Sequence, residues 1–379
     1  VLITEGSRGD GGYLLDKNLH RFMVDAEPKK QELASRDVVS RHMMQCMLDG
    51  NGVETPFGTH LWLDLRHLGA EHLETKLREV SEICRDFAGL NPANDLIPVR
   101  PTQHYSMGGI RVNKDGQAYD MAGLFAAGEA ACWDMHGFNR LGGNSLAETI
   151  VAGRVIGRRV AEYVASTSLD VPTSLAFEAA RRAEQRAAGW LERSGSGPSV
   201  YAIRDAMAET MMLNVGIFRT GEQLNRAVQE LSGLLSDCDK AVLRSKVPGM
   251  NPELSFALRL KGMLRLALVT ALGALARTES RGAHFRTDHP QRNDIDWLKR
   301  TLVRWPDGAG EPVFSYEPVG LIDLPPGDRG YGSAERIDMD RSIEEYNADV
   351  ESGQTANGRL ATRESIGSRM HWGAWKEYV

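Results

Sequence analysis

The sequence predicts a multidomain protein of mixed α/β and α+β class, and three observations lead to this prediction. Its 379 residues exceed what one hydrophobic core usually spans. Residues 124–146 have the order of a short apolar strand, a glycine-rich loop and a helix start, which is typical of the ligand-binding end of an α/β domain. Residues 173–286 are rich in Ala, Leu, Arg and Glu with helical periodicity, which indicates a helical bundle.

The N-terminal part of the chain combines helices with a strand. Apolar positions over 37–47 fit a helix, which the Gly-Asn-Gly run at 50–52 stops. Alternation over 59–65 predicts a strand. An amphipathic helix follows over 73–87, and Gly89 closes it because glycine readily adopts the left-handed conformation at a helix end. We therefore expect an α+β block here.

Short extended stretches precede the glycine-rich loop. Residues 110–112 and 118–119 read as two strands that Asn113-Lys114-Asp115-Gly116 joins as a hairpin. The apolar run 124–127 predicts one more short strand. The glycine-rich loop, residues 128–143, comes next. A helix is then predicted from about 146 to 164.

The start of this helix is the first candidate binding feature. Ser145 and Glu148 fit a capping box, and Gly153 and Gly157 share one helix face, so we expect the helix to lie close to a sheet. The N–H groups at a helix start carry a partial positive charge. They suit a phosphate, a carboxylate or a flavin ring that becomes anionic on reduction, and an ordinary capped helix is the alternative.

The C-terminal part changes from helices to extended chain. Helical periodicity covers about 175–192, 200–243 and 252–280, and prolines after Pro290 favour strands and turns. The polar tail carries Trp372 and Trp375 near its end. Two of the histidines have simple expectations: His136 stabilises the glycine-rich loop, with ligand contact as the alternative, and His284 lies in a solvated or partner-facing loop.

Composition and charge argue against several classes of function. The chain has 45 Lys and Arg against 51 Asp and Glu, a net charge of −6, so no basic surplus points to nucleic acid. The apolar run 266–276 is shorter than the about 20 residues of a membrane-spanning helix and predicts a core helix. The cysteines form no Cys-x-x-Cys pair for a metal or redox site; they are Cys46, Cys84, Cys132 and Cys238. We expect no metal site and a reducing compartment.

Several runs of residues carry more information than their periodicity. In chain order they are Thr4-Glu5-Gly6-Ser7-Arg8-Gly9-Asp10-Gly11-Gly12, Ser35-Arg36-Asp37-Val38-Val39, His104-Tyr105-Ser106-Met107-Gly108-Gly109-Ile110, Ala127-Gly128-Glu129-Ala130 and Gly137-Phe138-Asn139-Arg140-Leu141-Gly142-Gly143-Asn144-Ser145-Leu146. Together they resemble the motifs of the flavoprotein subunit of the succinate dehydrogenase/fumarate reductase family. The resemblance continues through 215–219 and 279–284 and becomes weaker after about 300.

The resemblance implies four parts of the chain. They are a substrate-closing capping domain at 1–100, the C-terminal part of a Rossmann-like FAD-binding domain at 101–168, a helical bundle domain at 169–290 and a small C-terminal domain at 291–379. It further implies an enzyme that interconverts succinate and fumarate by hydride transfer with FAD, in the tricarboxylic acid cycle or anaerobic respiration.

The resemblance assigns the dicarboxylate substrate to three residues. Arg140 and His104 would hold succinate or fumarate, with help from Thr4. Arginine suits this task because its planar guanidinium matches the geometry of a carboxylate. A clamped carboxylate would let charge develop on it as hydride moves between flavin N5 and the double bond.

The resemblance assigns proton transfer to a second group. Arg36 would pass the proton at the substrate carbon, and Glu5 and Arg8 would relay protons to Arg36. Because the pKa of arginine lies above about 12, Arg36 can act only transiently, with its two neighbours close enough to return the proton. From its residue type alone, Arg36 would be interpreted as a structural ion-pair residue.

The resemblance assigns FAD to residues on both sides of the glycine-rich loop. Glu129 would bind the ribityl chain, while Asn144, Ser145 and Leu146 at the helix start would lie by the isoalloxazine. No Gly-x-Gly-x-x-Gly follows an opening strand, and the chain begins at Val1. We therefore expect the family's N-terminal, ADP-binding half to be missing and this fragment alone to be inactive.

The resemblance also implies partners and a location. Electrons would pass through an iron–sulfur subunit and a membrane-anchor subunit to a quinone, at the cytoplasmic face of the bacterial inner membrane, without a membrane span in this chain. Two alternatives are an L-aspartate oxidase-like FAD enzyme, which shares the fold and the arginine pair, and a non-catalytic interaction fragment. The Arg-Leu-Gly-Gly-Asn-Ser wording of residues 140–145 disfavours the first.

Overall fold

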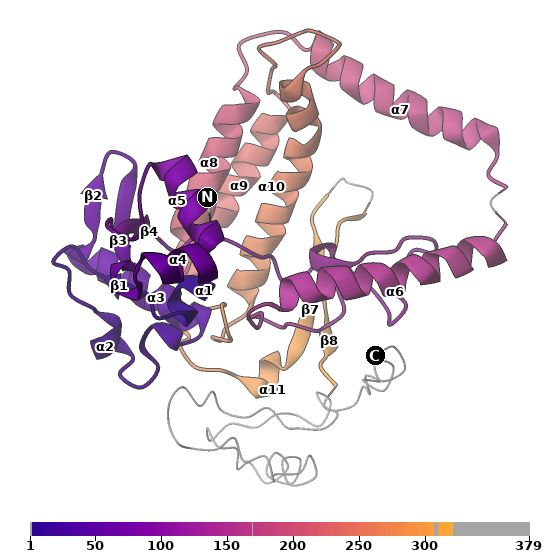
Figure 1. Cartoon of the computed structure of the whole chain (residues 1–379). Helices are drawn as coiled ribbons and strands as arrows, with labels where there is room; N and C mark the ends of the chain where they lie inside the picture. Colours follow the sequence, from indigo (N-terminus) through magenta and orange to yellow (C-terminus); the bar gives the residue numbers. More distant parts are fainter. Residues whose placement is uncertain (1, 169, 307–309, 321–379) are drawn as a thin grey trace. The chain divides into compact units, whose positions relative to one another are not determined.

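The computed structural model describes residues 2–168, 170–306 and 310–320, and these fall into two compact units (Figure 1). The first contains residues 2–161, and the second contains the described residues from 162 to 320. The structure mixes helices and sheets, as predicted. The finer division into four domains stays a prediction, and residues 321–379 of its last part, with Trp372 and Trp375, lie outside the described residues.

A small antiparallel sheet forms the base of the first unit. Strand β3 (Gly58–Asp64) pairs with β1 (Tyr13–Leu15), β2 (Val53–Thr55) and β4 (Ile97–Val99). Leu61 and Leu63 of β3 are 0% and 2% exposed, whereas the intervening Trp62 is half-buried. The strand predicted over 59–65 is confirmed within one residue.

Helices cover this sheet. The predicted first helix is α3 (Arg36–Cys46), and a π-helical turn, η2 (Met47–Asn51), continues it to Gly50, whose φ of +76° ends the helical conformation. The second predicted helix is two helices, α4 (Ala70–Lys76) and α5 (Arg78–Ala88), because Leu77 leaves the helical region. Gly89 caps α5 in the left-handed conformation, as predicted. The shorter elements are α1 (Gly6–Gly9), α2 (Met23–Ala26), η1 (Gln31–Leu33) and η3 (Arg66–Leu68).

A two-stranded parallel sheet precedes the glycine-rich loop. It pairs β5 (Ile110–Arg111) with β6 (Ala131–Cys132), and an antiparallel bridge from Val112 to Ala118 supports the predicted hairpin. The strand predicted over 124–127 is wrong: only Phe125 bridges, to Gln117, and the short helix η4 (Gly128–Ala130) follows. A single bridge does not make a strand, because a strand needs consecutive residues paired with a neighbouring strand.

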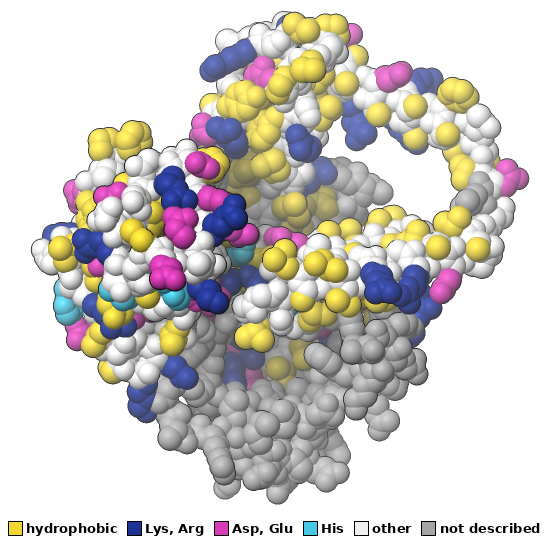
Figure 2. Space-filling view, in the orientation of Figure 1, with side chains coloured by type: hydrophobic (Ala, Val, Ile, Leu, Met, Phe, Trp, Pro, Cys, Tyr) yellow, Lys and Arg dark blue, Asp and Glu magenta, His cyan; other side chains and the backbone are white. Residues whose placement is uncertain are grey.

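The predicted helix after the loop is α6 (Asn144–Ser166). Its glycines do not lie against a sheet of the described chain, since no heavy atom lies within 4 Å of a Cβ built at Gly153 or Gly157. Apolar side chains along α6 are instead exposed, as Figure 2 shows: Leu146, Ile150, Val151 and Val164. That part of the prediction is wrong because small residues permit a close approach but do not provide the partner.

The second unit is built on long helices, and α8, α9 and α10 pack side by side (Figure 1). Its helices are α7 (Thr173–Glu192), α8 (Val200–Asn214), α9 (Gly221–Cys238) and α10 (Pro252–Ala276). Leu224, Leu231, Leu260 and Leu264 are 0% exposed, and burial of each stabilises the fold by about 1.5–3 kcal/mol. The bundle prediction is confirmed, and α10 contains the apolar run 266–276. None of the described helices is long and apolar enough to cross a membrane.

The single helix predicted over 200–243 is two helices, α8 and α9. The chain turns after Asn214, and Thr220 starts α9 by accepting a hydrogen bond from the Gln223 N–H at 3.2 Å. Periodicity alone misses this break because apolar residues continue on both sides of it. After the short helix α11 (Asp294–Trp297), the predicted strands form a hairpin of β7 (Lys299–Arg304) and β8 (Val313–Pro318).

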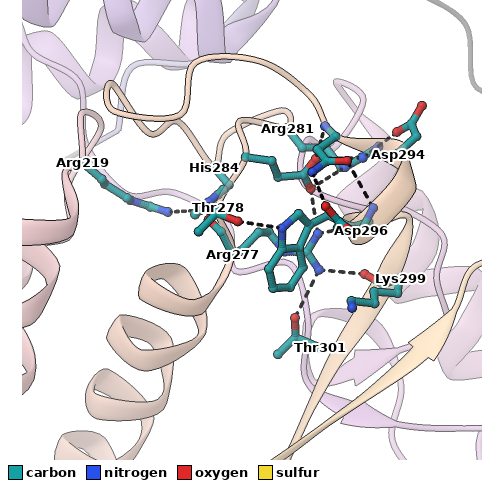
Figure 3. Close-up of polar contacts among 12 residues, drawn as sticks. Arg219, Arg277, Thr278, Arg281, His284, Asp294, Asp296, Lys299 and Thr301 are labelled. Carbon is teal, nitrogen blue, oxygen red and sulfur yellow. Dashed lines mark hydrogen bonds and ion pairs between the residues drawn. The ribbon is translucent and has the colours of Figure 1, made fainter. Parts of the chain in front are cut away.

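A buried polar cluster joins the end of α10 to this hairpin (Figure 3). Glu279 is 0% exposed and accepts from Arg277 at 2.7 Å and from Arg281 at 2.9 Å. His284 is 3% exposed: its Nδ1 lies 2.9 Å from Arg219 Nη1, and its Nε2 lies 3.2 Å from the Arg277 carbonyl. The expectation of a solvated loop at His284 is therefore wrong. Burial and the Arg219 charge lower the pKa of His284 to about 3.

Candidate active site

The three predicted proton-transfer residues lie together in the first unit. Glu5 precedes α1, and Arg36 is the first residue of α3. Glu5 Oε2 accepts hydrogen bonds from Arg36 Nε and Nη2, and Glu5 Oε1 lies 3.5 Å from Arg8 Nη2. One carboxylate thus bridges two guanidinium groups, which is the connectivity that a proton relay needs.

The two arginines of this relay have different surroundings. Arg8 is the more buried, and its Nη1 donates to the Glu32 carbonyl. Burial is the largest influence and lowers the pKa of Arg8, while Glu5 raises it and Arg36 lowers it further. The Arg36 and Glu5 side chains are 30% and 36% exposed, so both reach solvent.

An open pocket of about 360 Å³ lies over the relay. Its lining includes Thr4, Glu5, Arg8, Arg36, Gly142 and Gly143. Gly142 lies close to the ion pair, because a Cβ built there would stand 3.0 Å from Glu5 Oε2 and 3.8 Å from Arg36 Nη2. A side chain at that position would therefore press on the Glu5 carboxylate, which is the flexible end of its side chain.

A hydrogen bond ties the glycine-rich loop to the start of α3. Asn139 Nδ2 donates to Asp37 Oδ1 at 3.3 Å, and Asp37 also pairs with Arg41 at 3.0 Å and accepts from Ser35 Oγ at 2.5 Å. Asp37 is buried in the first turn of α3, directly after Arg36. This bond therefore joins the loop that carries Arg140 to the helix that carries Arg36, through the residue next to each arginine.

Arg140 is a buried cation in the glycine-rich loop. It is 5% exposed, its Nη1 donates to the Leu141 carbonyl at 3.0 Å, and its Cζ lies 4.9 Å from the ring centroid of Tyr105. No carboxylate among the described residues pairs with it, and its buried Nε has no hydrogen-bond partner there. Burial, followed by the nearby Arg36, lowers the pKa of Arg140. Because an uncompensated buried charge is costly, this group is suited to bind an anion.

The other substrate residues are less closely grouped. Thr4 is exposed and lines the same pocket as Arg36. His104 is exposed, and neither His104 nor Arg140 contributes to the lining of that pocket. Within the described chain, His104 is adjacent to Tyr105, which contacts Arg140. The structure thus joins the relay into one cluster and leaves His104 outside it.

The predicted FAD residues lie at both ends of the glycine-rich loop. Glu129 is exposed in η4 and accepts from the Ser106 N–H at 2.7 Å. At the start of α6, Asn144 donates its N–H to the Leu141 carbonyl at 3.3 Å. The N–H groups of Ser145 and Leu146 donate to no described backbone group. Since these two dipoles are free to meet a ligand, the helix start fits the anionic edge of a reduced flavin.

The predicted capping box is wrong. The helix begins at Asn144, one residue before Ser145, and Glu148 is turned away from the helix start. Glu148 is 5% exposed and accepts from Tyr105 Oη at 2.9 Å, Trp133 Nε1 at 2.9 Å and His136 Nε2 at 2.7 Å. With these three donors on its carboxylate, Glu148 does not turn back to the helix start. The expectation that His136 stabilises the loop agrees with this contact.

Sequence reasoning assigned no site role to Tyr105 or Trp133, and it assigned Glu148 only to a capping box. Tyr105 stands inside one of the recognised runs, next to His104, and its contact with Arg140 was not visible there. The one available signal was the acidic residue Glu148, one turn before the apolar positions Val151 and Ala152 of the same helix face.

Comparisons with known proteins cover most of the chain. Residues 1–146 match the FAD binding domain family, which confirms FAD as the cofactor of the family. Residues 204–331 match the family described as fumarate reductase flavoprotein C-term. The fumarate reductase flavoprotein subunit of Helicobacter pylori is 42% identical over 380 residues, 92% of this chain and 53% of that protein. The succinate dehydrogenase flavoprotein subunit of Rickettsia bellii is 41% identical over 85% of this chain and 55% of its own length.

Solved structures agree with these relatives. A variant of the Escherichia coli quinol fumarate reductase FrdA matches with a TM-score of 0.81 and 35% identity over 88% of this chain and 58% of that one. A quinol-fumarate reductase with menaquinol molecules matches with a TM-score of 0.79. The chain spans about half the length of the curated relatives it matches. By its motifs, fold and relatives, the chain belongs to the flavoprotein-subunit family of the succinate dehydrogenases and fumarate reductases.

Proposed function

We propose that the protein containing this chain interconverts succinate and fumarate. The observation that carries the proposal is Arg140, a buried guanidinium with no carboxylate partner among the described residues, on the same loop that approaches the Glu5–Arg36 pair. A dicarboxylate supplies the missing negative charge, and Thr4 and His104 are the residues proposed to help Arg140 hold it. The relatives named fumarate reductase and succinate dehydrogenase support this choice of substrate.

FAD is held at the glycine-rich loop in this proposal. The free N–H groups of Ser145 and Leu146 at the start of α6, with Asn144, would hold the flavin ring, and the exposed carboxylate of Glu129 would hold the ribityl hydroxyls. When bound, FAD supplies the N5 atom that exchanges hydride with the dicarboxylate.

The chain's own residues manage charge and protons. Arg140 stabilises the negative charge that develops on the clamped carboxylate. Arg36 delivers a proton to the carbon next to the one that receives hydride, so that hydride and proton together saturate the double bond of fumarate. Glu5, bonded to Arg36, returns the proton, and Arg8 connects the relay onward. Succinate oxidation runs the same steps in reverse.

The solved relatives support a place in an electron-transfer complex. One of them is a quinol-fumarate reductase with menaquinol molecules, and another is Mycobacterium smegmatis Sdh1 in complex with UQ1. We propose that electrons leave through an iron–sulfur subunit and a membrane-anchor subunit to a quinone. The protein then associates peripherally with the cytoplasmic face of the bacterial inner membrane through those partners.

Substrate oxidation by the purified, FAD-loaded protein that contains this sequence tests the proposal. We expect succinate to reduce the flavin and fumarate to reoxidise it. Reduction by L-aspartate but not succinate would establish the L-aspartate oxidase alternative instead. No reduction by either substrate, together with Arg140→Ala behaving like the unchanged protein, would leave the chain as a non-catalytic interaction part.

A further inference from the structure

Glu148 is the centre of a hydrogen-bond network that contacts Arg140 through Tyr105. Its carboxylate is buried in the first turns of α6 and receives three side-chain donors, from Tyr105, Trp133 and His136. An ionised carboxylate only accepts hydrogen bonds, so the His136 nitrogen that faces it carries a hydrogen. Three donors from two distant segments thus converge on one side chain, which fixes the orientation of each of them.

The branch through Tyr105 contacts Arg140 directly, and the His136 ring lies edge-on to the same Tyr105 ring, with centroids 5.8 Å apart. The Tyr105 hydroxyl donates to Glu148 Oε2 at 2.9 Å, and the face of the same ring lies 4.9 Å from Arg140 Cζ. Burial, followed by Glu148, raises the pKa of Tyr105 to about 12, so the hydroxyl stays protonated and keeps donating. Trp133 donates to the other oxygen, Oε1, on a branch that does not include Arg140.

Arg140 depends on Tyr105 for its orientation. Among the described residues, its guanidinium has one hydrogen bond, to the Leu141 carbonyl, and one ring contact, with Tyr105, and its Nε is unbonded. The cation–π attraction acts on a cation that lies over the ring face, so the position of the guanidinium depends on the position of the ring. The bond from Tyr105 to Glu148 holds the ring at its far end.

We propose that Glu148 is a positioning residue for substrate binding, acting through Tyr105 to hold Arg140 in the orientation that receives a carboxylate. This inference rests on the proposed dicarboxylate function. It assigns Glu148 no contact with the substrate. It also explains why a costly buried carboxylate stands at this point of α6.

Equilibrium binding of malonate tests the inference in the FAD-loaded protein that contains this chain. Malonate carries two carboxylates but no CH2–CH2 bond to oxidise, so binding is measured without turnover. We expect Tyr105→Phe, which keeps the ring and removes only the hydroxyl, to raise the malonate Kd by about tenfold, within the range of couplings in one network. Glu148→Gln raises it similarly, because one amide oxygen cannot accept from all three donors. Trp133→Phe, the matched control, removes one bond to the same carboxylate and leaves the Kd within about twofold.

A double-mutant cycle separates positioning from general damage to the fold. If Glu148 acts through Tyr105, the double variant Glu148→Gln/Tyr105→Phe binds malonate no more weakly than Glu148→Gln alone. Additive losses, or equal losses in Trp133→Phe, would overturn the inference while leaving the proposed function intact. Failure of the unchanged protein to bind malonate or succinate would overturn both. Glu148→Asp provides a further variant, in which partial return of affinity supports the role of the charge.

Discussion

Arg140 and Arg277 are both buried arginines, and the structure predicts opposite consequences when each is replaced by methionine. Arg140 is 5% exposed and has no carboxylate partner among the described residues. Arg277 is 2% exposed and pairs with Glu279 at 2.7 Å, and it also donates to the Trp297 and Lys299 carbonyls. The first guanidinium is therefore expected to serve binding, and the second is expected to serve stability.

The magnitudes follow from the contacts that each substitution removes. Arg140→Met loses one hydrogen bond and one cation–π contact, and it also removes an uncompensated buried charge, so the free energy of unfolding changes by less than about 2 kcal/mol. Arg277→Met breaks a buried ion pair, which costs about 3–5 kcal/mol. For malonate binding, Arg140→Met has the larger effect. It removes one partner of a buried charge pair with the ligand, which weakens binding by about 2–5 kcal/mol.

Denaturant unfolding with and without malonate measures both effects in the FAD-loaded protein that contains this sequence. At a concentration of 100 times Kd, a ligand that binds only the folded state adds about 2.7 kcal/mol to the free energy of unfolding. We expect Arg140→Met to keep its stability and lose most of this increment, and Arg277→Met to lose stability and keep the increment. An unchanged malonate increment in Arg140→Met would refute the assignment of Arg140 to the substrate.

Three further predictions concern the fold and the relay. Gly109→Ala destabilises the protein by about 3 kcal/mol or more, because φ at Gly109 is +122° and a Cβ there would stand 2.4 Å from the Ala130 carbonyl oxygen; Gly233→Ala, in an open position of α9, is the control and loses nothing in a urea titration. Gly142→Ala keeps the stability but slows flavin reduction by succinate about tenfold or more in stopped-flow mixing, because the new methyl group displaces the flexible Glu5 carboxylate; an unchanged rate would contradict this. His284, with its pKa lowered to about 3, takes up its proton more readily in the unfolded chain, so stability falls as pH drops from about 6.5 toward 3, by up to about 1.4 kcal/mol per pH unit. His284→Gln removes that part of the pH slope, and parallel slopes for the two proteins would exclude this role.

The elements that sequence predicts well here are those that local rules determine. The end of α5 at Gly89 and the span of α6 follow from glycine conformation and apolar periodicity. The break before Thr220 was missed because only one capping residue marks the start of α9 within a run of helical periodicity. The apolar run 124–127 was misassigned because strand formation depends on a partner that the sequence does not name.

The polar contacts were the least accessible part, because each joins residues far apart in the sequence. Tyr105 and Glu148 are separated by 43 positions, and Arg219 and His284 by 65. All four residues are of types that also occur at exposed positions, so residue type alone did not indicate these pairings. The relay residues Glu5 and Arg36 were anticipated through a family resemblance rather than through any pattern of charge.

Arg36→Gln provides the most direct test of the central proposal, which is that this chain carries the proton-transfer group for succinate and fumarate. Glutamine keeps a hydrogen-bond donor near Glu5 but cannot exchange a proton as a guanidinium does. In rapid mixing of the FAD-loaded protein with succinate, we expect flavin reduction to slow by about 100-fold or more, with the malonate Kd changed by less than about tenfold. Flavin reduction at the unchanged rate would contradict the assignment of proton transfer to Arg36.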